Sequence, residues 1–133
     1  MKNLILIIED NADNYYLMRY LLEHRGYKVL GADSGWMGIE LAHFNNPDII
    51  LLDIQLPGMD GYEIARQLKS DPKLCVIPIV AVTSYAMAHD REQALAAGAN
   101  GYIEKPINPD TFVDEIEKYI LDFGVAHEDS DSR

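Results

Sequence analysis

Short apolar runs recur along the chain, separated by longer segments in which apolar residues recur at helical spacing. Five runs are predicted to be β-strands, at residues 4–8, 28–32, 48–52, 78–82 and 100–103. The central runs are apolar at successive positions rather than at alternate ones, which is typical of parallel strands that are covered on both faces. The pattern therefore predicts a buried parallel sheet.

A segment with helical periodicity follows each predicted strand. The predicted helices span about residues 13–25, 35–44, 61–69, 86–97 and 108–122. Gly26 is expected to end the first helix in a left-handed conformation. Asp60 and Glu63 have the spacing of a capping box at the start of the third helix, and Asn108 is expected to cap the fifth helix ahead of Pro109.

The alternation of strands and helices defines the fold class. Five strand–helix units predict an α/β domain, because parallel strands are joined by right-handed crossover helices. The expected architecture is a doubly wound, five-stranded parallel sheet in one domain over residues 1–123. Residues 124–133 are polar and acidic, and we expect them to form a tail or the start of a linker.

Composition narrows the range of partners. The 133 residues include 11 Lys and Arg against 22 Asp and Glu, a formal charge of −11, which argues against direct binding to nucleic acid or to an anionic membrane. The sequence shows neither a targeting segment nor an apolar stretch long enough to span a membrane. The one cysteine, Cys75, excludes an intrachain disulfide and is expected to be a buried or half-buried thiol. We expect a cytoplasmic protein.

Polar side chains that could bind a ligand or take part in a reaction stand where four of the predicted strands end. They are Glu9, Asp10, Asp53, Thr83 and Lys105. In an open α/β sheet the carboxyl ends of the strands form the edge at which ligands bind. The sequence therefore predicts that three carboxylates, a hydroxyl and an ammonium group lie together.

Such a cluster favours phosphoryl chemistry that is assisted by a metal ion. Three neighbouring carboxylates repel one another unless a cation is present. Ligands that are all oxygen, with room for water, favour Mg²⁺ over Ca²⁺. A carboxylate beside Mg²⁺, a lysine and a hydroxyl is suited to accept a phosphoryl group.

These residues resemble the receiver domain of two-component response regulators over residues 3–119. The motifs that carry the resemblance are Ile7-Ile8-Glu9-Asp10-Asn11, the run from Leu51 to Gly61, Ala81-Val82-Thr83-Ser84 and Tyr102-Ile103-Glu104-Lys105-Pro106. The resemblance implies a flavodoxin-like (βα)5 fold with strand order 2-1-3-4-5. It also implies a signalling switch rather than a turnover enzyme.

The resemblance implies a role for each acidic residue. Asp53 would accept the phosphoryl group from a phosphohistidine of a sensor histidine kinase or of a phosphotransfer domain. Asp10 would ligate Mg²⁺ directly, Glu9 mainly through water, and the backbone carbonyl of Gln55 would supply a further oxygen. Gln55 and Tyr85 occupy the two variable positions that flank the site, which the family uses to tune the lifetime of the phosphoryl group.

The remaining implied roles concern switching. Lys105 would pair with the phosphoryl group, and its peptide bond to Pro106 is expected to be cis. Thr83 would hydrogen-bond a phosphoryl oxygen, and Tyr102 would swing inward as Thr83 moves. The face formed by the fourth helix, the fifth strand and the fifth helix would then bind a downstream target or a second copy of the chain.

Two other classes of protein are alternatives to a receiver domain. A phosphohydrolase of the haloacid dehalogenase type places its nucleophile on the first strand with a second Asp two positions later, but Asp10 and Asp13 are three apart. A flavodoxin-like cofactor binder needs a loop rich in hydroxyl groups and glycine after the first strand, but residues 9–14 are acidic. The sequence leaves open whether the receiver acts alone or is part of a larger regulator.

Overall fold

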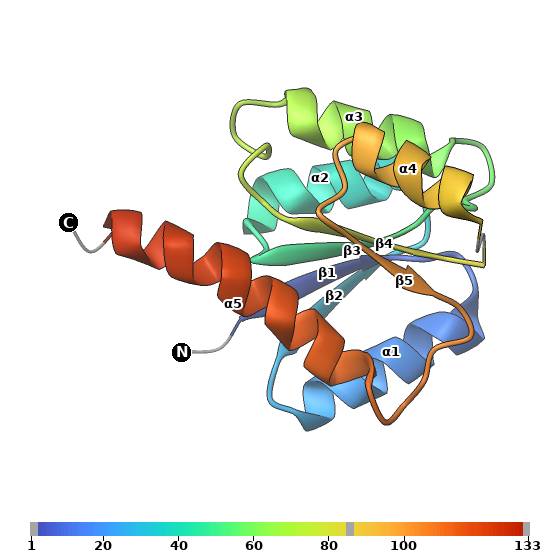
Figure 1. The fold of residues 1–133 in the computed structure, drawn as a ribbon, viewed down its shortest axis with the longest axis horizontal. Coiled ribbons are helices and arrows are strands. Elements are labelled where there is room, and N and C mark those ends of the chain that lie inside the picture. Colours follow the sequence, from blue (N-terminus) through green and yellow to red (C-terminus); the bar gives the residue numbers. More distant parts are fainter. Residues whose placement is uncertain (1–2, 85–86, 132–133) are drawn as a thin grey trace.

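Five parallel strands form one sheet in the structure, a computed structural model that describes residues 3–84 and 87–131, with side chains as far as residue 122. The strands are β1 (Leu4–Ile8), β2 (Lys28–Ala32), β3 (Ile49–Asp53), β4 (Ile79–Thr83) and β5 (Gly101–Glu104). Their order across the sheet is β2-β1-β3-β4-β5 (Figure 1). The predicted fold class and strand order are therefore confirmed.

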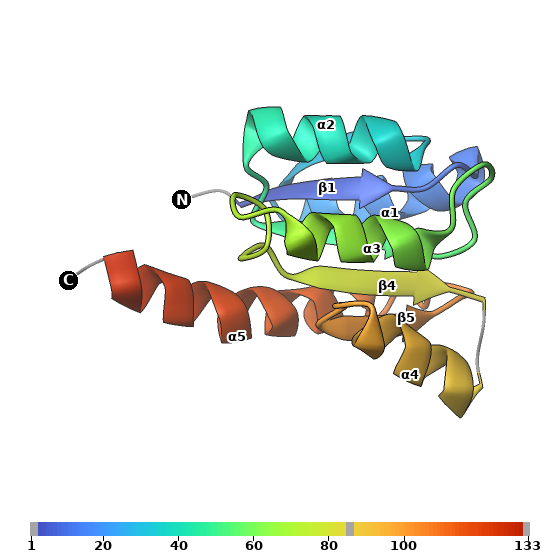
Figure 2. The ribbon, with the colours of Figure 1, turned by 90° about the horizontal axis from the view of Figure 1, so that it is seen from above.

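Helices cover both faces of the sheet. They are α1 (Ala12–His24), α2 (Gly35–Asn45), α3 (Gly61–Ser70), α4 (Ala88–Ala96) and α5 (Phe112–Asp131). Helices α2, α3 and α4 lie on one face and α1 and α5 on the other (Figure 1), and α2 and α3 run alongside the strands (Figure 2). Successive strand residues point to opposite faces, so Ile50 packs in the core under α2–α4 and Leu51 in the core under α1 and α5.

The central strands are buried at every position, as their continuous apolar sequence predicts. All residues of β3 and β4 are buried, whereas β2, at the edge of the sheet, is buried only at Ala32. Within the parts of the chain that the structure describes, we find no helix with the length and apolar character needed to cross a bilayer.

The first four helices begin and end within two residues of the predicted positions, but both ends of α5 differ. Asn108 makes the hydrogen bonds expected of a cap residue, but one turn ahead of α5. Its Oδ1 accepts the Asp110 N–H at 3.0 Å, and its carbonyl oxygen accepts the N–H groups of Thr111 at 3.2 Å and of Phe112 at 2.9 Å. These bonds form a turn that precedes the first residue of α5, Phe112. At the other end, the backbone stays helical to Asp131, so the predicted end near Asp122 is wrong. The division into residues 1–123 and 124–133 remains a prediction.

At the start of α3, Asp60 caps the helix but the reciprocal bond of a capping box is not formed. Asp60 Oδ1 accepts the Tyr62 N–H at 3.0 Å, which confirms Asp60 as the cap residue. The sequence predicts that Glu63 completes a capping box, but its carboxylate pairs with Arg66 at 3.2 Å instead. Arg66, one turn further along the helix, therefore pairs with the exposed Glu63 carboxylate in place of the backbone N–H of Asp60.

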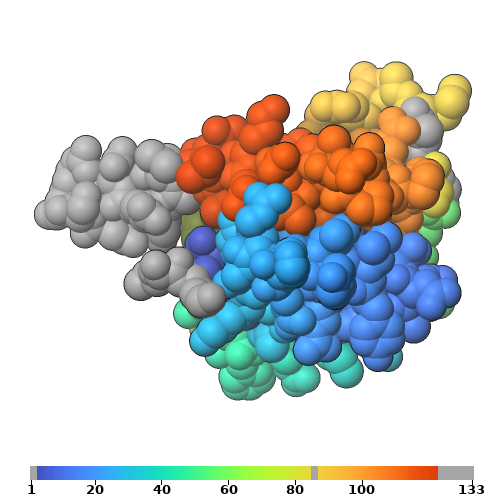
Figure 3. Space-filling view, turned by 90° about the horizontal axis from the view of Figure 1, so that it is seen from below, coloured from blue at the N-terminus to red at the C-terminus, as the bar shows by residue number. Residues whose placement is uncertain are grey.

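Helix α1 lies beside α5 on the face shown in Figure 3. At the end of α1, Arg25 Nη1 lies 2.7 Å from Glu117 Oε1 and 3.3 Å from Asp114 Oδ1. The Tyr27 hydroxyl donates to Glu117 Oε2 at 2.7 Å. Burial and this acceptor raise the pKa of Tyr27 to about 12, so the phenol keeps its proton at neutral pH.

The outer surface of α2 carries large apolar side chains. Trp36 is 64% exposed and Phe44 is 80% exposed, and Met37 lies between them in sequence. Together with Glu40 and Lys73, these side chains line a shallow groove. This surface lies away from the sheet, so its side chains contribute little to the core.

Cys75 is exposed, so the predicted burial of its thiol is wrong. The segment between α3 and β4 buries Leu74 and Ile77 instead, and these two side chains fill the space near the sheet. The Cys75 Sγ lies 3.6 Å from the carbonyl oxygen of Pro72 at the surface.

Gly61, the first residue of α3, lies against the backbone at the end of β3. A Cβ atom at this position would lie 2.4 Å from the Ile54 Cα and 2.9 Å from the Asp53 carbonyl oxygen. We expect Gly61→Ala to lower the free energy of unfolding by about 1–3 kcal/mol in urea denaturation, because backbone atoms cannot move aside as a side chain can. Gly38→Ala is the matched control, since the atoms nearest to a Cβ there belong to the side chain of Ile8 and not to the backbone. An equal loss in the two variants would contradict this explanation.

Candidate functional site

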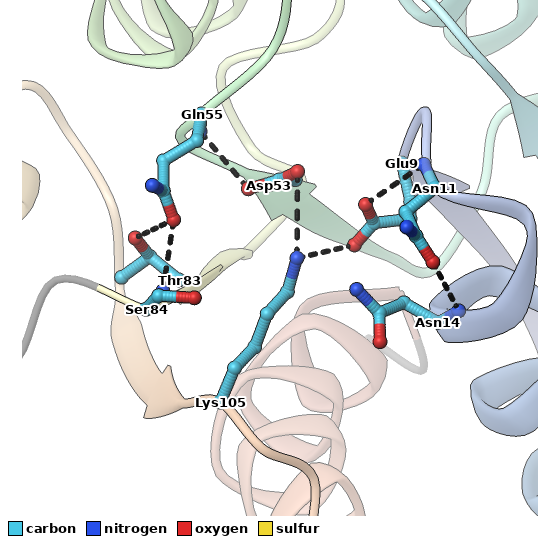
Figure 4. Close-up of polar contacts among 8 residues, drawn as sticks. All are labelled: Glu9, Asn11, Asn14, Asp53, Gln55, Thr83, Ser84 and Lys105. Carbon is cyan, nitrogen blue, oxygen red and sulfur yellow. Dashed lines mark hydrogen bonds and ion pairs between the residues drawn. The ribbon is translucent and has the colours of Figure 1, made fainter.

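The predicted site residues gather at the carboxyl edge of the sheet (Figure 4). Among the residues whose side chains are described, three polar or charged ones are buried: Glu9 and Asp53, each 3% exposed, and Thr83, which is fully buried. All three stand at the ends of neighbouring strands, β1, β3 and β4. Burial of polar groups is costly, so their concentration at one edge marks a functional site.

Lys105 links the two buried carboxylates. Its Nζ lies 2.8 Å from Glu9 Oε1 and 3.4 Å from Asp53 Oδ2, between the two groups in Figure 4. The Lys105 N–H donates to the carbonyl oxygen of Thr83 at 2.8 Å, which fixes the base of the side chain to the end of β4. The peptide bond between Lys105 and Pro106 is cis, as predicted.

The surroundings of Glu9 disfavour the charged form of its carboxylate. Burial raises the pKa of Glu9 to about 7; the Lys105 ammonium opposes this rise, and the neighbouring Asp53 carboxylate adds to it. Glu9 Oε2 accepts the Asn11 N–H at 3.2 Å. Glu9 Oε1 is buried and, within the described part of the chain, accepts no hydrogen bond of normal geometry despite its short distance to Lys105.

Asp10 completes an acidic cluster with Glu9 and Asp53. Each of the three residues offers a carboxylate oxygen, and these oxygens all lie within 4.8 Å of one another. Asp10 is exposed, so the cluster is open to solvent on one side. Three neighbouring carboxylates, two of them buried and one open to water, fit a hard cation such as Mg²⁺.

Gln55 contacts both Asp53 and Thr83, which sequence reasoning did not foresee. Its N–H donates to Asp53 Oδ1 at 2.9 Å. Its side-chain Oε1 accepts the Thr83 hydroxyl at 3.3 Å and the Ser84 N–H at 3.0 Å (Figure 4). The sequence places Gln55 near the site but gives no signal for the direction of its side chain.

Tyr102 lies on β5, one strand from Thr83. Its side chain is buried, and the Arg91 guanidinium carbon lies 5.9 Å from the centre of its ring. The predicted coupling of Tyr102 to Thr83 remains a prediction. Tyr85, predicted as the second variable position, lies outside the described residues.

The structure brings together the acidic cluster, the lysine and the threonine that the resemblance to receiver domains implies, on a sheet with the order 2-1-3-4-5. Comparison with family models shows the same class: the model described as response regulator receiver domain matches residues 5–117. This chain therefore belongs to the response regulator receiver family of two-component signalling. The match favours the receiver over the phosphohydrolase and over the flavin binder.

Similar proteins that are response regulators or receiver domains support this assignment. The chain is 41% identical over 122 residues to the polar-differentiation response regulator DivK of Brucella ovis, covering 92% of this chain and 99% of that protein. A CheY-like receiver domain from Methanospirillum hungatei has a similar structure, with a TM-score of 0.86, 27% identity, and coverage of 95% of this chain and 99% of that one.

A third relative carries a metal ion. It is the receiver domain of a sensor histidine kinase from Pseudomonas aeruginosa, with a magnesium ion coordinated in its active-site cleft. The two chains are 31% identical, with a TM-score of 0.80 and coverage of 92% of this chain and 98% of the other. Receiver domains bind Mg²⁺ at an acidic pocket and interact with sensor kinases or phosphotransfer proteins and with downstream targets.

Proposed function

We propose that Asp53 accepts a phosphoryl group from a phosphohistidine of a sensor histidine kinase or a phosphotransfer domain. The observation that carries this proposal is the placement of Asp53: a buried carboxylate held by the Gln55 N–H on one oxygen and by Lys105 on the other. A carboxylate oxygen attacks phosphorus, the phosphorus–nitrogen bond to the donor breaks, and an acyl phosphate forms. Buried, preoriented groups favour such a transfer because they need little rearrangement.

The neighbouring residues each assist Asp53 in this proposal. Lys105 pairs with the phosphoryl oxygens, and Thr83 donates a hydrogen bond to one of them. Glu9, Asp10, Asp53 and the backbone carbonyl of Gln55 would hold Mg²⁺, directly or through water. When bound, the ion neutralises negative charge that develops on the transferring group.

In this proposal the phosphorylated protein itself is the product, and it acts as a signal. We infer that the chain assists its own phosphorylation and dephosphorylation but is not a turnover enzyme, and that it acts in the cytoplasm. The face formed by α4, β5 and α5 would change as Thr83 and Tyr102 move, and would then bind a downstream protein or a second copy of the chain.

Acetyl phosphate tests the central claim. With acetyl phosphate and Mg²⁺, intact-mass analysis should show one added phosphoryl group, and reductive trapping followed by peptide mapping should place it on Asp53. Without Mg²⁺ the labelling should fall sharply. Absence of label, or a label on another residue, would overturn the proposal.

Asp10→Asn should change the response of stability to Mg²⁺. Because Asp10 lies in the acidic cluster, its neutralisation should raise the melting temperature slightly in metal-free buffer and abolish the further rise caused by Mg²⁺. Asp13→Asn, at an exposed acid on α1, is the control and should keep the full Mg²⁺ effect. Thermal unfolding with and without Mg²⁺ measures both. Stabilisation of Asp10→Asn by Mg²⁺ to the wild-type extent would exclude Asp10 as a ligand.

A further inference from the structure

Two hydrogen bonds of the Gln55 side chain connect the loop after β3 with the end of β4, and its backbone N–H makes a local one. Its N–H donates to the Asp53 carboxylate, and its side-chain oxygen accepts both from the Thr83 hydroxyl and from the Ser84 N–H. Figure 4 shows the Gln55 side chain turned toward Thr83 and Ser84, on the opposite side of Asp53 from Glu9. One residue thus contacts both the proposed phosphoacceptor and the hydroxyl proposed to respond to it.

The direction of the hydrogen bond to Thr83 follows from the Ser84 N–H. A backbone N–H is always a donor, so the Gln55 atom that it contacts must be the carbonyl oxygen of the amide. A carbonyl oxygen cannot donate, and the Thr83 hydroxyl is therefore the donor in the 3.3 Å contact. A hydroxyl has a single proton to donate, so the Thr83 hydroxyl cannot donate to Gln55 and to a phosphoryl oxygen on Asp53 at the same time.

We propose that the Gln55 side chain is a positioning residue that holds the Thr83 hydroxyl away from Asp53 until phosphorylation. This inference rests on the proposed function, in which Thr83 must donate to a phosphoryl oxygen on Asp53. To do so, the hydroxyl must give up its hydrogen bond to Gln55. The strength of that bond therefore sets how readily the switch leaves its unphosphorylated arrangement.

The cost of breaking this contact is modest. A neutral hydrogen bond contributes a net amount that corresponds to roughly a twofold to tenfold change in an equilibrium or rate. Removing the acceptor should therefore speed labelling within that range, without abolishing it. The backbone N–H and carbonyl groups of Gln55 are unchanged by substitution of its side chain, so contacts made by the main chain remain.

Gln55→Met and Gln55→Glu test the contact before any phosphorylation. Methionine has nearly the length of glutamine but lacks the acceptor oxygen, whereas glutamate keeps one. In unphosphorylated protein, the Ser84 amide should exchange with solvent several-fold faster in Gln55→Met than in wild type, and at nearly the wild-type rate in Gln55→Glu. Equal exchange in Gln55→Met and wild type would overturn the inference, even if Asp53 proves not to be phosphorylated.

A double-mutant cycle tests the effect on the switch. The labelling rate with acetyl phosphate and Mg²⁺ is measured by intact mass for wild type, Gln55→Met, Thr83→Val and the double variant. We expect Gln55→Met to label roughly twofold to tenfold faster than wild type, and to have no effect when Thr83 is already valine. An increase that persists in the Thr83→Val background would show that Gln55 acts on access to Asp53 and not through the hydroxyl, which would overturn the proposal.

Discussion

Asp53→Ala is expected to abolish labelling by acetyl phosphate and Mg²⁺ completely. The cause is chemical: the variant has no carboxylate at the end of β3, where Lys105 and the Gln55 N–H hold the acceptor oxygens. Glu9 and Asp10 follow β1 rather than β3, so neither carboxylate stands at the position that Asp53 occupies. Loss of the nucleophile removes the covalent step itself. Intact-mass analysis over a time course measures the effect.

Asp33→Ala is the matched control for this experiment. Asp33 is an exposed acid just after β2, at the same edge of the sheet but outside the acidic cluster. The control should label at the wild-type rate, and circular dichroism should show that both variants keep the fold. Undiminished labelling of Asp53→Ala would place the acceptor elsewhere and refute the assignment.

The second large effect is a loss of stability with rising pH in metal-free buffer, caused by Glu9. Its pKa is about 7 in the folded protein and 4.5 without perturbation. Between these values the unfolded chain releases the proton while the folded chain keeps it, so the free energy of unfolding falls as pH rises. The shift corresponds to about 3 kcal/mol in total, all of it lost above pH 7 and none below pH 4.5.

Urea denaturation between pH 4.5 and pH 8 measures this dependence. Glu9→Gln cannot ionise, so the difference in stability between the variant and wild type should grow with pH and level off above pH 7. The subtraction removes contributions from groups that are the same in both proteins. Saturating Mg²⁺ should reduce the wild-type dependence, because a cation favours ionised Glu9. Parallel pH curves for the two proteins would show that Glu9 is not destabilised by burial.

The sheet, and the identity of most residues in the site, can be predicted from the sequence for the same physical reason. Strands buried on both faces must be apolar at every position, so the first polar residue after each run marks the exposed edge. This rule, applied to the sequence alone, is enough to place Glu9, Asp53 and Thr83 together. At the end of β5 the rule selects Glu104, and Lys105, the next residue, is the one that reaches the site.

Contacts decided by side-chain direction could not be predicted in this way. The bond from Thr83 to Gln55 depends on the path of the loop after β3, which no periodicity describes. Helix ends show a similar limit, since Asn108 caps a turn that leads into α5 and the helix itself begins only at Phe112. The prediction for Cys75 is wrong because Leu74 and Ile77 take the buried positions in an irregular segment.

Trp36 gives the protein a natural optical reporter. It is the only tryptophan in the chain, and its indole stands in solvent on the outer surface of α2. This indole is already largely exposed in the folded protein, so its emission wavelength should change little as the chain denatures. A molecule that covers α2 would instead move it into an apolar environment and shift its fluorescence toward the blue. Contact at this helix can therefore be followed without attaching a dye.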